Sequence, residues 1–201
     1  MTIQDVKRAF VTDAATELFL QNSISSVTIR DVAGASGVGE ATVYRYFQNR
    51  SNLIVACALK LQAEVGALFM DFPENSSAYE KLERFYCAYM KIFKTHPNLY
   101  RFLSEFDAYC IASGETELEE YQDNFDRFRT TVLEIYRQGV ACGEVKELKD
   151  PDLFYQTTTH ALLSLCKKLA TERHIVRQDA AIDPCEEIRT LTDLILAALK
   201  K

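Results

Sequence analysis

Apolar residues recur every three or four positions along most of the chain, a period that predicts helices rather than strands. In the first such stretch, residues 4–21, every fourth position is apolar: Val6, Phe10, Ala14 and Leu18, with Ala15 and Phe19 beside them. We expect this row to be the buried face of a helix. Asn22 follows, and we expect it to end the helix in the left-handed conformation that asparagine tolerates.

Two short helices are predicted next. Thr28 and Asp31 have the spacing of a capping box, in which a hydroxyl and a carboxylate satisfy each other's backbone N–H groups where a helix begins. Gly37 breaks this helix. A second short helix is expected to run from just after Gly39 to about Phe47.

Longer helices fill the rest of the chain. Proline, glycine and capping residues place them at about 50–69, 77–95, 98–110, 115–142, 151–173 and 184–200. No stretch alternates as a strand would, and the chain has only 7 glycines and 4 prolines. The sequence therefore predicts an all-α fold of about nine helices.

The second and third helices carry the spacing of a helix-turn-helix. This motif needs a small residue where its helices touch, a glycine able to take positive φ in the turn, and a β-branched residue that seats the second helix on the first. Ala33, Gly37 and Val43 meet these needs in order. Residues 40–46 would then be the recognition helix.

The outward side of that helix offers groups suited to nucleic acid: Thr42, Tyr44, Arg45 and Tyr46. Their hydroxyl groups can donate to phosphate, and the threonine methyl or a tyrosine ring can touch a thymine methyl. The chain has 201 residues and a net charge of −6, but residues 1–52 are neutral and residues 53–201 carry all of the excess. Because charges are screened beyond about 10 Å, the acidic part does not prevent the first part from binding DNA.

Several classes of site are not indicated. The six cysteines are scattered singly, so they are expected to be reduced and to act as small apolar residues. His160 and His174 have no partner at metal-ligand spacing, and we expect neither a metal nor another cofactor. The N-terminus lacks the apolar core of a secretory signal, and no segment is expected to span a membrane, which points to the cytoplasm.

Three segments resemble the N-terminal signature of the TetR family of bacterial transcriptional repressors. They are ATELF (residues 15–19), VTIRDVAGASGVGEATVYRYF (27–47) and NRSNL (49–53), and QGVACGEV before the DPDLF helix is also typical of the family. The resemblance implies a three-helix DNA-binding domain at 1–48 and an effector-binding and dimerisation domain at 49–201. It implies a regulator rather than an enzyme.

The resemblance also implies roles for individual residues. Thr28, Arg30 and Arg50 would contact phosphates or the groove rim, and Thr42 and Tyr44 would make contacts from the recognition helix. Base preference would depend on Glu40, Ala41, Arg45 and Tyr46. Glu40 has two interpretations that stay open: a carboxylate that stabilises the helix start, or one that accepts from a cytosine N4 amine.

The second part of the chain would sense a small molecule and dimerise. Aromatic residues are the expected pocket lining: Tyr89, Phe93, Phe106, Tyr109, Phe128 and Tyr155. They favour an apolar or aromatic effector that releases a homodimer from double-stranded, palindromic operator DNA. Helices at about 151–173 and 184–200 would pair with those of a second copy, although their apolar stripes could equally pack within one chain. The helix at 50–69 would connect the effector pocket to the DNA-binding domain.

Two hypotheses about function from other classes compete with that of a ligand-responsive DNA-binding regulator. The chain could be an enzyme or thiol-based sensor that uses Cys110 or Cys142, but no cysteine has a basic neighbour in sequence that would form a thiolate. Alternatively, the helix-turn-helix could serve protein contacts only, in which case DNA affinity would not fall steeply with salt.

Overall fold

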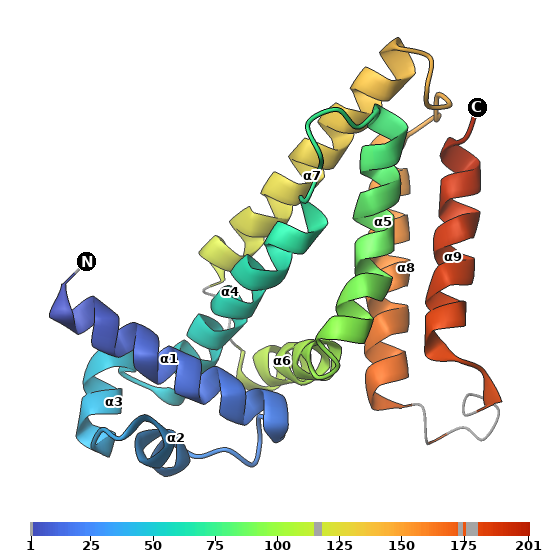
Figure 1. The fold of residues 1–201 in the computed structure, drawn as a ribbon. Coiled ribbons are helices and arrows are strands. Elements are labelled where there is room, and N and C mark those ends of the chain that lie inside the picture. Colours follow the sequence, from blue (N-terminus) through green and yellow to red (C-terminus); the bar gives the residue numbers. More distant parts are fainter. Residues whose placement is uncertain (1, 115–117, 173–174, 176–180) are drawn as a thin grey trace. The chain divides into compact units, whose positions relative to one another are not determined.

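The computed structural model describes residues 2–114, 118–172, 175 and 181–201 (Figure 1). Within these ranges the chain forms nine α-helices and no strand, apart from an isolated bridge between Val145 and Lys200. The helices are α1 (Ile3–Gln21), α2 (Ile29–Ser36), α3 (Glu40–Phe47), α4 (Arg50–Phe69), α5 (Ala78–Thr95), α6 (Leu99–Ser113), α7 (Glu119–Ala141), α8 (Pro151–Thr171) and α9 (Pro184–Leu199). The predicted all-α class is confirmed.

Most helix starts follow from capping residues. Thr28 and Asp31 form the predicted capping box of α2, and Ser77 and Glu80 form one at α5. Each box satisfies two N–H groups that the first turn of a helix leaves without a partner. Asn49 caps α4, because its Oδ1 accepts from the Asn52 N–H at 2.8 Å.

The chain forms two compact units. One comprises Met1–Glu64 and Arg101–Tyr121, and the other comprises Val65–Tyr100 and Gln122–Lys201. The boundaries fall inside α4, α6 and α7, so these helices contribute residues to both units. The first unit therefore takes in more of the chain than residues 1–48, which we proposed from the sequence as the DNA-binding domain.

The buried face of α1 differs from the predicted one. Val11, Ala15 and Phe19 are almost completely buried, whereas Val6 and Phe10 are 50% and 57% exposed. Both rows are apolar and spaced four apart, so the helical period alone cannot choose between them. In the structure the row that contains Phe19 is the buried one, and the Phe19 ring lies 6.4 Å from the Phe102 ring of α6.

Two helix ends adopt unexpected conformations. Asn22 is extended (φ −128°, ψ 165°) rather than left-handed, and its side-chain amide donates to the Leu18 carbonyl instead. Gln48, between α3 and α4, has φ 64° and ψ −45°. The Asn49 N–H donates to the Phe47 carbonyl at 2.7 Å, so Gln48 is the centre of a strained γ-turn.

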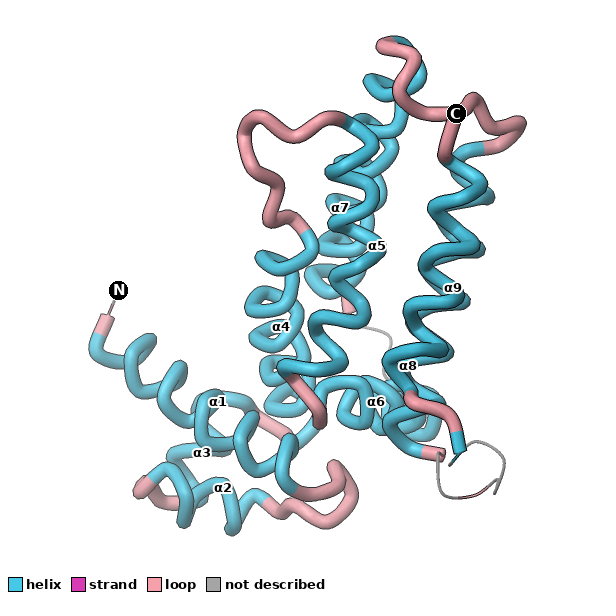
Figure 2. The backbone as a smooth tube through the Cα atoms, turned by 45° about the vertical axis from the view of Figure 1, so that its right-hand side comes forward, coloured by secondary structure: helices cyan, strands magenta, loops and turns pink. Residues whose placement is uncertain are grey.

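The second unit is built around three helices that pack on one another, α5, α8 and α9 (Figures 1 and 2). The apolar stripes of α8 and α9 face α5 within the same chain, with Leu162 and Ile188 fully buried. Near the end of α7, a Cβ on Gly139 would come within 2.5 Å of the Val145 side chain, so only glycine fits.

One helix, α4, is long and apolar enough to be compared with a membrane span. By length and composition alone, α4 could cross a membrane, because an 18-residue window in it has a mean hydropathy of 1.4. In the structure this helix is a core element, and Leu53, Ile54 and Cys57 are fully buried. Its apolar character serves packing in the fold.

Candidate nucleic-acid interface

The turn between α2 and α3 has the predicted helix-turn-helix geometry. Gly37 is left-handed (φ 64°, ψ 20°), and its N–H points to the carbonyls of Ala33 and Gly34. Val43 and Phe47 are buried at 0% and 1% exposure. The short helix α3 is thus seated on α2 by one face, and its other face is left outward.

The outward face carries the predicted contact residues. Tyr44 is 49% exposed, Arg45 is exposed, and Thr42 and Tyr46 are half-buried. The Arg45 guanidinium lies 5.2 Å from the centre of the Tyr46 ring and within 3.5 Å of its hydroxyl. This contact orients the one cation of α3 along the surface.

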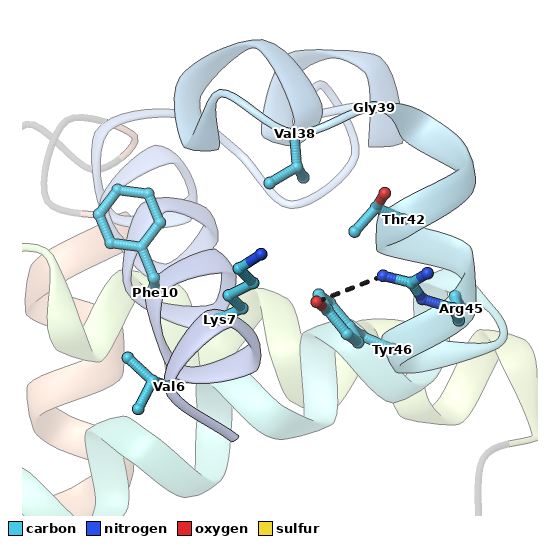
Figure 3. A pocket seen from close by; sticks show the side chains of 8 residues that line it. All are labelled: Val6, Lys7, Phe10, Val38, Gly39, Thr42, Arg45 and Tyr46. Atoms are coloured by element: carbon cyan, nitrogen blue, oxygen red, sulfur yellow. Dashed lines mark hydrogen bonds between the residues drawn. The ribbon is translucent and has the colours of Figure 1, made fainter. Parts of the chain in front are cut away.

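Thr42, Arg45 and Tyr46 also line a groove of about 500 Å³ (Figure 3). The rest of its wall comes from α1 and the turn before α3: Val6, Lys7, Phe10, Val38 and Gly39. Two cations and two hydroxyl groups border this groove and no carboxylate does, so it suits an anionic occupant. Sequence reasoning missed the α1 residues because Val6 and Phe10 were assigned to the core.

The remaining predicted contacts lie near helix starts. Arg30, Glu40 and Ala41 are exposed. The Thr28 hydroxyl donates to the Asp31 carboxylate at 2.6 Å and accepts from the Asp31 N–H at 3.2 Å. The hydrogen bonds that the Thr28 hydroxyl and the Thr28 N–H donate to the carboxylate lower the pKa of Asp31. The hydroxyl is therefore committed to the cap and can meet a phosphate only by changing partner.

Arg50 is engaged inside the protein. Its guanidinium donates to the Ile24 carbonyl and, at 3.2 Å, to the Val27 carbonyl, and lies 5.7 Å from the centre of the Tyr109 ring. The Tyr109 hydroxyl is in turn 2.7 Å from Ser51 Oγ. The expected phosphate contact of Arg50 stays a prediction, whereas its role in holding the connection between α1 and α2 is visible.

The six predicted pocket residues do not form one group. Phe106 packs on Tyr121 in the first unit, with ring centroids 5.4 Å apart, and Tyr109 lies beside Arg50. The other four belong to the second unit. Phe93 stacks on Tyr100 at 6.0 Å.

The other three surround two phenylalanines of the second unit. Phe69 lies 4.8 Å from Tyr89 and 6.2 Å from Phe128, and Phe85 lies 6.0 Å from Tyr155. Burial raises the pKa values of Tyr89 and Tyr155, so both are neutral phenols over the physiological range. This aromatic cluster (Phe69, Phe85, Tyr89, Phe128 and Tyr155) is the part of the predicted lining that the structure brings together.

No metal-binding group is found among the described residues, which exclude His174. Burial raises the pKa of Cys57 and of Cys166 to about 12, so these thiols stay protonated. Cys142 is exposed.

Comparisons with known proteins agree with this geometry. Residues 11–57 match the family model for bacterial regulatory proteins of the tetR family. A fatty acid metabolism regulator of Bacillus subtilis is 22% identical over 148 residues, which is 73% of this chain and 74% of that protein.

Solved structures share the whole fold. A TetR-family transcriptional regulator from Rhodococcus covers 94% of this chain and 98% of its own, with a TM-score of 0.74 and 17% identity. A fatty acid degradation regulator from Bacillus halodurans gives a TM-score of 0.70 at 16% identity, covering 94% of both chains. A regulator from Saccharomonospora viridis in complex with choline gives 0.76 at 16% identity, covering 96% and 97%.

The helix-turn-helix of the first unit, the matched family model and the shared fold lead to one conclusion. Residues 11–57 form a helix-turn-helix domain that matches the tetR family of bacterial regulatory proteins, and the chain as a whole has the fold of solved TetR-family regulators.

Proposed function

We propose that this protein is a TetR-family transcriptional repressor that binds a palindromic operator as a homodimer and leaves it when a small apolar or aromatic molecule binds. The observation that carries the proposal is the outward face of α3, which presents the hydroxyl groups of Thr42, Tyr44 and Tyr46 and the guanidinium of Arg45. Val43, on the opposite face, is buried. A short recognition helix of this kind contacts base edges in the major groove, while residues at nearby helix starts contact the backbone.

The groove beside α3 extends the proposed interface to α1. Lys7 and Arg45 supply positive charge, and Val6 and Phe10 supply apolar surface at the same place. A deoxyribose–phosphate unit presents the matching chemistry, an anion on an apolar ring. We therefore add Lys7 and Phe10 to the expected DNA contacts Thr28, Arg30, Glu40, Ala41, Thr42, Tyr44, Arg45, Tyr46 and Arg50.

Dimerisation is proposed through the faces of α8 and α9 that do not pack on α5. The apolar stripes predicted for an interface are used within the chain, so the interface would use the opposite, exposed side. That side holds the exposed polar residues Gln156, His160 and Asp193 and, among them, small or apolar residues: Thr157, Ala161, Ser164, Leu194 and Ala197. A twofold dimer places two recognition helices about one DNA turn apart, roughly 34 Å, and doubles the contact area.

The effector is proposed to bind at the aromatic cluster of the second unit. Its side chains are apolar, and their few polar atoms are neutral phenols. Two of the relatives are named for fatty acid metabolism or degradation, which fits an effector with an apolar chain. An operator on chromosomal DNA would be reached from the cytoplasm, so we propose that the protein is cytoplasmic.

The test begins with selection of bound DNA from a random pool, read for a palindrome. Operator affinity is then measured by fluorescence anisotropy from 50 to 300 mM salt for wild type, Arg45→Gln and the α7 surface control Arg127→Gln. If both copies of Arg45 meet phosphates, the slope of log affinity against log salt falls by about 2 in magnitude. If Arg45 reads a base, preference at one operator position relaxes instead.

Either result supports the proposal. Recovery of no palindrome, or equal binding of all DNA by wild type and Arg45→Gln, refutes it. Glu40→Gln, measured on operators that differ only by cytosine or thymine, separates the two interpretations of Glu40.

A further inference from the structure

Two charged residues of α6 hold the segment that joins α1 to α2. The Arg101 guanidinium donates to the carbonyls of Phe19 at 3.0 Å, Leu20 at 2.8 Å and Asn22 at 3.2 Å. It also donates to the Glu105 carboxylate at 2.7 Å. The three carbonyls lie at the end of α1, where a helix lacks its own donors and its dipole favours a cation.

Glu105 completes this contact from the other side. Its second carboxylate oxygen accepts the Ile24 N–H at 2.5 Å, and the Ile24 carbonyl accepts from Arg50. Both backbone groups of Ile24 are therefore bound by charged side chains, and its own side chain is 98% buried. We call Arg101 and Glu105 the α6 clamp.

The residue before the clamp is held in the second unit. The Tyr100 hydroxyl donates to the Tyr89 carbonyl at 3.1 Å, and the Tyr100 ring stacks on Phe93. Tyr89 belongs to the aromatic cluster. Consecutive residues at the start of α6 thus bind α5, through Tyr100, and the end of α1, through Arg101.

We propose that the α6 clamp positions the helix-turn-helix for operator binding and that Tyr100 controls the clamp. Arg101 and Glu105 act through the segment Phe19–Ile24, which leads directly into α2, and touch no DNA themselves. The inference rests on the proposed function, because operator affinity is its main readout. It assigns positioning roles to residues that lie outside the helix-turn-helix in sequence.

Three variants test it: Arg101→Ala, Glu105→Gln and Tyr100→Phe, with Arg127→Ala as a control that removes an exposed hydrogen bond of α7. Loss of charged hydrogen bonds should weaken specific operator binding by Arg101→Ala about tenfold. The salt slope should stay that of wild type, because no phosphate contact is lost. Thermal unfolding confirms that each variant is folded at the assay temperature, and binding to random DNA should be unchanged.

The double variant Tyr100→Phe/Arg101→Ala tests the link between the two residues. If Tyr100 acts through Arg101, the double variant binds no more weakly than Arg101→Ala alone. If the two losses multiply, the proposed control by Tyr100 is wrong. Wild-type operator affinity in both clamp variants would overturn the positioning role and leave the proposed function standing.

Hydrogen exchange of the Ile24 amide, measured without DNA, provides an independent arm. We expect Arg101→Ala and Glu105→Gln to speed this exchange, and Arg127→Ala to leave it unchanged. Unchanged protection in both clamp variants refutes the clamp. If the wild type bound no specific DNA, the proposed function would fail, and this arm would still decide whether the clamp exists.

Discussion

The turn glycine of the helix-turn-helix should respond to alanine in the opposite way from a glycine three residues earlier. Gly37 has positive φ, and a Cβ there would meet no atom within 4 Å. Alanine at this position therefore suffers only the backbone penalty of the left-handed conformation, about 1 to 2 kcal/mol. Gly34 lies within α2, and a Cβ there also meets nothing within 4 Å. Alanine at 34 should stabilise the helix by about 0.5 to 1 kcal/mol.

The two variants should therefore differ by about 2 kcal/mol in the free energy of unfolding, or about 4 to 8 °C in Tm for a chain of this length. Circular dichroism during thermal and urea unfolding measures the difference. Gly37→Asn should fall between Gly37→Ala and wild type, because asparagine tolerates the left-handed region. A Gly37→Ala protein as stable as Gly34→Ala would show that the turn conformation is not what the glycine provides.

Other variants test further features of the fold. With the pKa of Cys57 raised to about 12, a thiol reagent at pH 8 should label exposed Cys142 quickly and Cys57 only after unfolding; rapid labelling of Cys57 in the native protein would contradict its burial. The lowered pKa of Asp31 means that its stabilisation is complete above about pH 5, well above the unfolded pKa, and is lost as pH falls through the folded value. The stability difference between wild type and Asp31→Asn should therefore shrink on acidification, and a constant difference would argue against the cap. Gln48→Gly should raise stability by about 1 kcal/mol, since glycine relieves the strain at φ 64°, whereas a loss in urea unfolding would show that the side chain matters more.

The features that could be predicted from sequence are those determined by residues a few positions apart in the chain. Thr28 with Asp31 defined the start of α2, and Gly37 defined its end, because each acts within one turn of the chain. The buried face of α1 could not be predicted, since two apolar rows satisfy the same period and only contacts with distant helices, such as that of Phe19 with Phe102, distinguish them. The groove beside α3 was missed for the same reason, because it depends on Phe10 being exposed.

Contacts between residues that lie far apart in the sequence could not be predicted from it. Arg101 binds carbonyls that lie 79 to 82 positions earlier, and a surface arginine in a predicted helix carries no sign of that partner. Arg50 shows the related difficulty that one residue type serves two purposes, since a guanidinium suits a phosphate and a peptide carbonyl equally. The aromatic pocket prediction was limited because composition identifies aromatic residues and does not say which of them share a core.

The γ-turn at Gln48 leaves almost no length of chain between the recognition helix and α4. Only Gln48 and Asn49 separate the two helices, and each is fixed by a backbone or capping hydrogen bond. A connection this short and this constrained does not let α3 and α4 change their relative orientation. A change in the direction of the first turn of α4 must therefore reorient α3 by a similar angle. Insertion of two glycines between Gln48 and Asn49 should therefore make the direction of the recognition helix independent of the direction of α4, while leaving each helix intact.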